Sequence, residues 1–285
     1  MQTEYETADA PQVPGGHPAR LSARGITLGY GAEPIICDLS LDIPTAELTA
    51  IVGPNGCGKS TLLKAFARVL PVSGGGVIEL DGRPVHETPT REVAKKLALL
   101  PQGPIAPEGL TVRELVSQGR FPYQSLVRQW SREDARAVTE AMAAANVTDL
   151  ADRRVSELSG GQRQRCWIAM VLAQETDLLL LDEPTTFLDL KVQVELMTLL
   201  RDVAHDQGRT LVVVMHELNV AAAFADSLVM MRDGSITAQG PVDHVFTAEN
   251  LDQVFGLDAA VLNDPESGRP VCVPRVSLRP DIAAQ

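Results

Sequence analysis

The sequence predicts an α/β fold in which a mainly parallel β-sheet is covered on both faces. Short apolar runs of strand length alternate with helical stretches, and this alternation is typical of parallel sheets. Over residues 107–168 the apolar spacing becomes helical throughout, which indicates a helical subdomain inserted into the sheet-forming part. We therefore expect an α/β core over residues 21–106 and 169–256. The chain's 285 residues, 45% of them hydrophobic, are ample for its interior.

The two ends of the chain are expected to lie outside this core. Residues 1–20 are rich in proline, glycine and polar side chains and predict a flexible tail, while residues 257–285 form a C-terminal extension. The tail has acids where a signal peptide needs bases, and no run approaches the roughly 18 apolar residues of a spanning helix. The four cysteines form no C-x-x-C pair and predict buried, reduced thiols. These features predict a soluble cytoplasmic protein.

The first half of the core predicts strands, a glycine-rich turn and a helix, in that order. Residues 21–44 are strand-like, Leu48–Val52 is an apolar strand, and residues 59–70 carry apolar side chains at helical spacing. Glycines before Val77–Leu80 and the Asp81-Gly82 pair after it predict a hairpin strand.

The second half of the chain predicts a capped helix followed by further apolar strands. Ser131, with Asp134 three residues later, has the pattern of a capping box at a helix start. Residues 178–181, 211–215 and 228–231 are strand-length apolar runs, separated by helical stretches such as residues 190–203.

Residues 53–61 read GPNGCGKST, which matches G-x-x-x-x-G-K-[ST] between a strand and a helix. Glycines allow consecutive backbone N–H groups to surround phosphate oxygens, and the helix N-terminus adds a partial positive charge. We expect Lys59 to neutralise the β- and γ-phosphates and Ser60 to coordinate Mg²⁺. The strand and helix on either side make a chance glycine-rich turn the weaker interpretation. The candidate ATP-binding residues of this loop are Gly53, Pro54, Asn55, Gly56, Cys57, Gly58, Lys59, Ser60 and Thr61.

A second acidic motif, LLLLDEP over residues 178–184, places two carboxylates at the carboxyl end of a buried strand. Ligands of doubly wound sheets bind at that edge. Asp182 is therefore a candidate Mg²⁺ ligand, and Glu183 a candidate for orienting or deprotonating the attacking water. His216 follows the next apolar strand at the same edge and is a further catalytic candidate, with a structural role as the alternative.

Residues 158–165 read LSGGQRQR and predict a second helix N-terminus built for an anion. Ser159 can cap the helix, with Gln162 at its third position, and Gly160 and Gly161 admit close approach of phosphate to backbone N–H groups.

Together with the loop, LLLLDEP and His216, this segment closely resembles the ATPase subunits of ABC transporters over about residues 20–275. The resemblance implies a P-loop NTPase fold with a RecA-like parallel-sheet core, a small antiparallel β subdomain and an inserted α-helical subdomain. It also implies that Tyr30 stacks on adenine, that Gln102 links Mg²⁺ to the permease contact, and that Asp189 communicates across a dimer. The residues 159–162 would then meet the ATP held by the paired ATPase subunit, in a homodimer or a related pair.

Within that family the chain most resembles importers of iron(III)–siderophore complexes, haem and cobalamin, with the siderophore branch fitting best. The stretches that carry this likeness are residues 111–126, 158–190 and 254–274. It implies integral membrane permease subunits, an extracytoplasmic substrate-binding protein and a peripheral position on the cytoplasmic face of a bacterial membrane. Haem or cobalamin import and a soluble ABC ATPase of iron–sulfur cluster assembly remain alternatives. Ala46 departs from the family, which usually has a turn glycine there.

Four residues of the helical subdomain, Arg113, Arg120, Phe121 and Tyr123, fall in the part expected to face the permease, with an ordinary solvated face as the alternative. The net charge of −12 argues against a nucleic-acid partner. It does not argue against ATP, because backbone N–H groups, helix N-termini, one lysine and Mg²⁺ receive the phosphates. Most of the excess acid lies in residues 175–285, with 18 acids and 7 bases.

Overall fold

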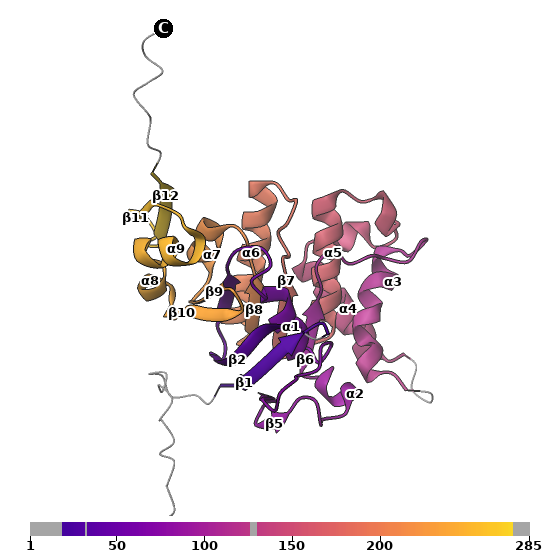
Figure 1. Cartoon of the computed structure of the whole chain (residues 1–285). Helices are drawn as coiled ribbons and strands as arrows, with labels where there is room; N and C mark the ends of the chain where they lie inside the picture. Colours follow the sequence, from indigo (N-terminus) through magenta and orange to yellow (C-terminus); the bar gives the residue numbers. More distant parts are fainter. Residues whose placement is uncertain (1–18, 32, 126–129, 276–285) are drawn as a thin grey trace, which may run out of the picture.

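The computed structural model describes residues 19–31, 33–125 and 130–275 (Figure 1). Residues 1–18 of the expected tail and residues 276–285 of the C-terminal extension lie outside the described residues. Within the described part, no helix is both long enough and apolar enough to cross a bilayer.

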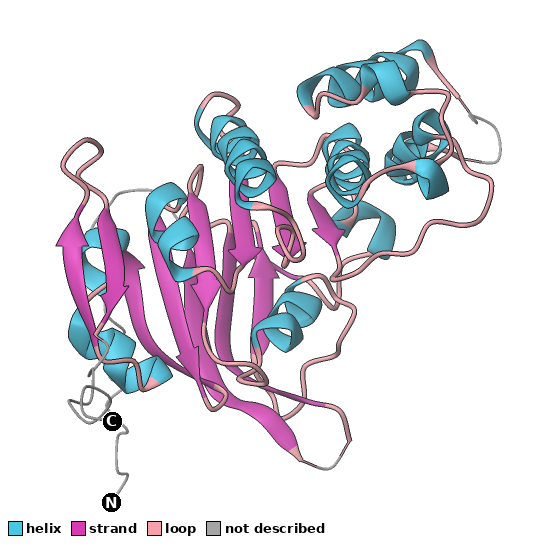
Figure 2. Cartoon of the chain, turned by 90° about the horizontal axis from the view of Figure 1, so that it is seen from above, coloured by secondary structure: helices cyan, strands magenta, loops and turns pink. Residues whose placement is uncertain are grey.

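A six-stranded sheet in the order β10-β9-β3-β8-β7-β6 forms the centre of the fold. Figure 2 shows the strands in magenta with helices in cyan around them. All neighbours pair in parallel except the edge strand β10, which is antiparallel to β9. The sequence prediction of a mainly parallel sheet is confirmed. The strands are β3 (Leu48–Val52), β6 (Leu97–Leu100), β7 (Leu178–Asp182), β8 (Thr210–Val214), β9 (Ser227–Arg232) and β10 (Ser235–Pro241).

The two faces of this sheet bury alternate residues of each strand in two separate cores. In β7, Leu179 and Leu181 face a core shared with the inserted helices and the later helices, whereas Leu178 and Leu180 face the other core. Period-two alternation in fully apolar strands is what a sheet covered on both faces requires. The second core is closed by helix α1 (Lys59–Phe66), by Val93 of the short helix α2 (Thr90–Val93) and by a small antiparallel sheet.

That small sheet has the order β2-β1-β4-β5 and lies beside α1 (Figure 1). Its β4–β5 hairpin turns through Asp81 and Gly82, whose φ values are 51° and 70°, as tight hairpin turns of this kind need. The predicted hairpin is therefore confirmed. The strands are β1 (Leu21–Gly29), β2 (Pro34–Ile43), β4 (Val77–Leu80) and β5 (Arg83–Pro84).

Helix α1 ends earlier than its sequence pattern predicts. Apolar spacing continues to Leu70, but the helix stops at Phe66 because Arg68 adopts a left-handed φ of 62°. The side chain of Arg68 donates to the carbonyl oxygen of Thr88, an interaction that the local sequence does not reveal.

The inserted helices lie on one side of the sheet in Figure 1. Capping boxes at Thr111, Ser131 and Ser159 begin three of them, and the last two were predicted. Of the four residues considered for the permease face, Phe121 is exposed, but Arg120 is only 1% exposed. For Arg120 both the permease-facing and the solvated interpretation are therefore wrong. The elements are α3 (Val112–Ser117), η1 (Gln118–Tyr123), α4 (Arg132–Ala144), η2 (Thr148–Leu150), η3 (Val155–Glu157) and α5 (Gly160–Ala173).

The C-terminal hairpin of β11 and β12 is hydrogen-bonded to helix α7 near both ends of that helix. The Asn219 side chain exchanges two hydrogen bonds with the backbone of Cys272, and Arg269 donates to the carbonyl oxygen of Ala225. Three of the four cysteines are buried, while Cys37 is exposed, against expectation. The elements are α2 (Thr90–Val93), α6 (Leu190–His205), α7 (Leu218–Phe224), α8 (Val242–Val245), α9 (Ala248–Phe255), β11 (Ala259–Asn263) and β12 (Pro270–Pro274).

Candidate functional site

The glycine-rich loop between β3 and α1 has a backbone that side chains larger than hydrogen would disrupt. Gly56 and Gly58 have φ values of 80° and 106°, which L side chains rarely adopt. A Cβ on Gly53 would lie 2.2 Å from the carbonyl oxygen of Met231 and 2.8 Å from Cys57 Sγ. The loop is therefore a tight cradle that ends at the N-terminus of α1.

A cavity of about 530 Å³ opens in front of this loop, at the carboxyl ends of β7 and β8. Its size is in the range of small-molecule sites, roughly 300–1,000 Å³. Both the loop and the acidic strand end contribute to its wall. The cavity is lined by Ile35, Asn55, Gly56, Gly58, Lys59, Ser60, Thr61, Gln102, Glu183, Thr186, Phe187 and His216.

The ammonium group of Lys59 is held by the loop itself. Its Nζ donates to the carbonyl oxygens of Gly53 at 2.8 Å and Pro54 at 3.0 Å, and the residue is only 4% exposed. Both of these acceptors are neutral carbonyl groups, which an anionic ligand can replace as the partner of the ammonium group. Gly53 and Pro54 do not line the cavity themselves, but their carbonyl groups hold Lys59, which does.

Ser60 lines the cavity and is hydrogen-bonded to Asp182, a predicted residue that is buried and does not itself border the cavity. Ser60 Oγ donates to Asp182 Oδ1 at 2.9 Å. Burial raises the pKa of Asp182, and the nearby carboxylate of Glu183 adds to that rise, whereas the hydrogen bond from Ser60 opposes it. A buried carboxylate in this condition gains from a cation. A hydroxyl and a carboxylate are hard oxygen ligands, and Mg²⁺ prefers these together with substrate phosphates, so the residues present fit Mg²⁺.

Glu183 has a polar contact on each carboxylate oxygen. Its Oε1 lies 2.5 Å from His216 Nε2, and its Oε2 accepts hydrogen bonds from Gln102 Nε2 at 2.6 Å and Thr186 Oγ1 at 3.1 Å. The backbone of Glu183 is left-handed, with φ 52°, and its N–H donates to the carbonyl oxygen of Val214. Such strain is retained where surrounding contacts fix it, often at functional sites.

Several predicted residues do not border this cavity. Residues 159–162 form the capped start of α5 and are absent from the described residues that line the wall. Tyr30 is 58% exposed, and Lys64 Nζ lies 5.9 Å from the centre of its ring. Asp189 caps α6 by accepting a hydrogen bond from Val192 N at 3.0 Å. Cys57 is buried under the loop.

The cavity also includes three residues outside the sequence-based site: Ile35, Thr186 and Phe187. The hydroxyl of Thr186, three residues after Glu183, was the detectable signal, because a side chain so close in sequence can reach the same carboxylate. Ile35 comes from the small sheet and Phe187 is fully exposed, and neither carries a sequence signal for a site.

Comparison with known proteins gives the same family throughout. The ABC transporter family profile matches residues 36–186. The "Probable siderophore transport system ATP-binding protein YusV" of Bacillus subtilis (strain 168) is 51% identical over 254 residues, covering 89% of this chain and 92% of the relative. The "Ferric enterobactin transport ATP-binding protein FepC" of Escherichia coli (strain K12) is 46% identical over 265 residues, covering 93% and 97%. The "Hemin import ATP-binding protein HmuV" of Thermobifida fusca (strain YX) is 40% identical over 254 residues, covering 89% and 88%.

Solved structures agree with these relatives. An inward-facing metal-chelate type ABC transporter has a chain that superimposes with a TM-score of 0.78 at 30% identity, covering 91% of this chain and 98% of that one. The dimeric ATP-binding cassette MJ0796, in a post-hydrolysis state bound to ADP and Pi, superimposes with a TM-score of 0.69 at 28% identity, covering 78% and 98%.

Proposed function

Because the chain belongs to the ABC transporter family, as one of its ATP-hydrolysing subunits, we propose that it powers import of an iron(III)–siderophore complex through a separate membrane permease. The observation that carries the ATPase part is the convergence of three groups on one cavity. These are the glycine loop with Lys59, the Ser60–Asp182 pair, and Glu183 with His216.

In this proposal the cavity holds the phosphates of ATP. Loop N–H groups and the N-terminus of α1 receive the phosphate oxygens, and Lys59 exchanges its carbonyl acceptors at Gly53 and Pro54 for the β- and γ-phosphates. Ser60 and Asp182 would hold Mg²⁺, with Gln102 nearby. When bound, Mg²⁺ neutralises charge that develops on the phosphate oxygens.

Glu183 is the proposed base for hydrolysis. A water oxygen attacks the γ-phosphorus, the bond from phosphorus to the β–γ bridging oxygen breaks, and Glu183 takes the water's proton. His216 orients that carboxylate and donates to the charge developing on the transferred group. Acceptance of the proton needs one of the two carboxylate oxygens to become free, since Gln102 and His216 now occupy them.

The site is incomplete in one chain. Residues 159–162 form a helix N-terminus suited to phosphate, but they lie outside their own cavity. We propose that they close over the ATP held by a second subunit, with Tyr30 on the adenine and Asp189 at the dimer contact. Two ATP molecules then lie between head-to-tail subunits, and hydrolysis reopens the pair.

Transport follows from coupling this opening and closing to a permease. Gln102 touches the proposed base and begins the segment that leads into the inserted helices. We propose that residues 107–168 dock on integral permease subunits at the cytoplasmic face of a bacterial membrane. A substrate-binding protein on the other side would deliver the cargo.

The siderophore assignment is supported by the relatives at 46–51% identity, against 40% for the hemin relative. The test is uptake of radioactive iron by a strain that lacks this gene and carries it on a plasmid. Wild-type chain should restore uptake of iron(III)–siderophore, and the Glu183→Gln variant should not. Restoration of haem or cobalamin uptake instead would select the corresponding alternative cargo. A requirement only for iron–sulfur enzyme activity, with no membrane protein co-purifying, would select cluster assembly.

A further inference from the structure

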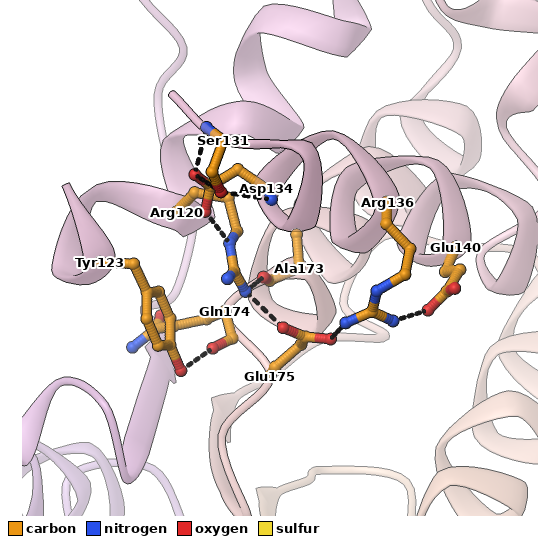
Figure 3. A network of polar contacts seen from close by, with 9 residues as sticks. All are labelled: Arg120, Tyr123, Ser131, Asp134, Arg136, Glu140, Ala173, Gln174 and Glu175. Carbon is orange, nitrogen blue, oxygen red and sulfur yellow. Dashed lines mark hydrogen bonds and ion pairs between the residues drawn. The ribbon is translucent and has the colours of Figure 1, made fainter. Parts of the chain in front are cut away.

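A buried arginine that the proposed hydrolysis does not use lies at the base of the inserted helices. Arg120, in η1, is 1% exposed. Its Nε donates to Asp134 Oδ1 at 2.9 Å, and its Nη1 donates to the carbonyl oxygen of Ala173 at 2.8 Å and to Glu175 Oε2 at 2.7 Å (Figure 3). Burying a guanidinium costs several kcal/mol unless it is well paired. These three acceptors therefore pair the buried positive charge of Arg120.

The partners of Arg120 are themselves held in place. Asp134 Oδ2 accepts hydrogen bonds from Ser131 N at 2.9 Å and Ser131 Oγ at 2.7 Å. Burial alone would raise the pKa of Asp134, but the hydrogen bonds from Ser131 and Arg120 outweigh it and keep that pKa below its usual value. The other oxygen of Glu175 accepts from Arg136 at 2.8 Å (Figure 3). Removing the guanidinium would thus leave two carboxylates fixed without their shared cation.

The same cluster joins the end of α5 to the start of β6, and the chain continues from α5 into β7. The ring of Tyr123 lies 4.0 Å from the Arg120 guanidinium carbon, and its hydroxyl donates to the carbonyl oxygen of Gln174 at 2.9 Å. Gln174 Nε2 in turn donates to the carbonyl oxygens of Ala94 at 2.5 Å and Leu97 at 3.2 Å, at the start of β6. Strand β7 begins shortly after the cluster.

The far ends of these three elements carry the proposed ATPase groups. Helix α5 begins at residues 159–162, β6 leads to Gln102, and β7 ends in Asp182 and Glu183. Helix α5 has 14 residues and is about 21 Å long, so a tilt of about 3° about its C-terminal end moves its N-terminal end by about 1 Å. A misplacement of about 1 Å in a site can cost about a hundredfold in rate.

Glu175 provides an independent sign that its carboxylate is needed. It follows the end of α5 with a φ of 52°, where glycine is the usual residue. A residue with a side chain is strained in this conformation. Strain of this kind persists where surrounding contacts fix it, and here the carboxylate bonds to both Arg120 and Arg136.

We propose that Arg120 is a positioning residue for ATP hydrolysis. It fixes the C-terminal end of α5 relative to β6 and β7. Residues 159–162 at the other end of α5 then reach the partner's ATP while Glu183 is correctly placed. This inference rests on the proposed function only in that a second subunit completes the site. It predicts that loosening the cluster lowers turnover while ATP binding to the cradle of the same chain stays intact.

The test compares three variants of the full chain by steady-state ATPase kinetics, ATP affinity and thermal unfolding. Arg120→Lys keeps the charge but cannot reach all three acceptors. Glu175→Gly removes the carboxylate and relieves the backbone, so it keeps the fold even if the first variant does not. Arg275→Ala is the control, because it removes an exposed arginine that pairs with Asp258 at 3.4 Å and takes no part in the cluster.

Support for the proposal is a fall in kcat of about tenfold or more for Arg120→Lys and Glu175→Gly, with ATP affinity and Arg275→Ala turnover within about twofold of wild type. Wild-type kcat in both cluster variants would overturn it. Equal loss of kcat and ATP affinity, or an equal loss in Arg275→Ala, would also overturn it, because that pattern reflects general destabilisation. The cargo plays no part here, so failure of siderophore uptake and failure of this inference are separate results.

Discussion

Glu183, which follows β7, and His216, which follows β8, are in contact, with Glu183 Oε1 2.5 Å from His216 Nε2. The second oxygen of Glu183 accepts a hydrogen bond from Gln102 at 2.6 Å. The proposed base therefore touches both the strand end that carries His216 and the segment that leads to the inserted helices. In the proposed mechanism a change in either position would alter the contacts of Glu183 and so link motion of the inserted helices to hydrolysis.

The Glu183→Gln variant should bind ATP, lose turnover and remain as a closed dimer. Glutamine keeps the shape of the side chain but cannot accept the proton from water, and a positioned base contributes about 10²–10⁴-fold. Steady-state ATPase rates and size-exclusion chromatography with ATP measure both effects. Glu217→Gln is the control, since Glu217 pairs with Thr185 at 3.4 Å and should leave turnover intact. Rapid hydrolysis by Glu183→Gln would refute the base assignment.

The Lys59→Ala variant should lose nucleotide affinity. Truncating one partner of a buried charge pair costs roughly 2–5 kcal/mol, or about 30-fold or more in affinity. Equilibrium binding of a fluorescent ATP analogue gives the value. Lys96→Ala, which removes a surface pair with Asp81 at 2.6 Å, should bind ATP as wild type does. Unchanged affinity in Lys59→Ala would count against the cradle.

The sequence was sufficient where function depends on local chain geometry. The glycines of residues 53–58, the cap at Ser159 and the apolar strand before Asp182 are each encoded within a few neighbouring positions. Periodicity also assigned the strands of the core, because fully buried parallel strands are continuous apolar runs.

Contacts between residues far apart in the sequence could not be predicted from local sequence patterns. Arg120 looked like a surface residue because its acceptors Asp134, Ala173 and Glu175 are 14, 53 and 55 positions away. The left-handed backbone of Glu183 was equally hidden, since it arises from packing of the strand end against β8. Both features depend on tertiary contacts that override local preference.

The Asp182→Asn variant should be more stable than wild type while losing hydrolysis. Burial raises the pKa of Asp182, so ionisation of this group opposes folding. Asparagine removes the charge and still accepts the hydrogen bond from Ser60. Each 1 kcal/mol gained corresponds to about 2–4 °C in Tm for a chain of this size, which differential scanning fluorimetry without Mg²⁺ and ATP resolves.

The pH dependence of that difference has a definite sign. The folded-state pKa of Asp182 lies above its unfolded value, so the folded state holds the proton longer. The two proteins should therefore be similar in stability where Asp182 is protonated, and the advantage of Asp182→Asn should grow as pH rises through the raised pKa. Greater stability of the wild type at neutral pH would contradict the burial argument.

The cysteines should differ in reactivity according to their exposure. Cys37 is exposed, whereas burial raises the pKa of Cys57 and raises that of Cys166 to about 11. A thiol reagent at neutral pH should modify Cys37 rapidly and Cys57 slowly. In a Cys37→Ser background, protein alkylated at Cys57 should fail to bind ATP, because the adduct displaces the loop at Gly53. Undiminished ATP affinity after complete modification of Cys57 would exclude this.

The Ala46→Gly variant should stabilise the chain without altering its kinetics. Ala46 has a φ of 59°, which costs a residue with a side chain roughly 1–2 kcal/mol, whereas glycine loses roughly 0.5–1 kcal/mol through the freedom of the unfolded chain. The difference favours glycine by up to about 1.5 kcal/mol, a rise in Tm of up to about 6 °C. The backbone N–H of Ala46 donates to Thr210 Oγ1 at 3.0 Å. Glycine has the same N–H group, so this hydrogen bond is kept. Ala67→Gly, at the right-handed end of α1 with φ −79°, should instead lower Tm. A lower Tm for Ala46→Gly would contradict this prediction. The methyl group of Ala46 would then stabilise the turn by more than the left-handed backbone destabilises it.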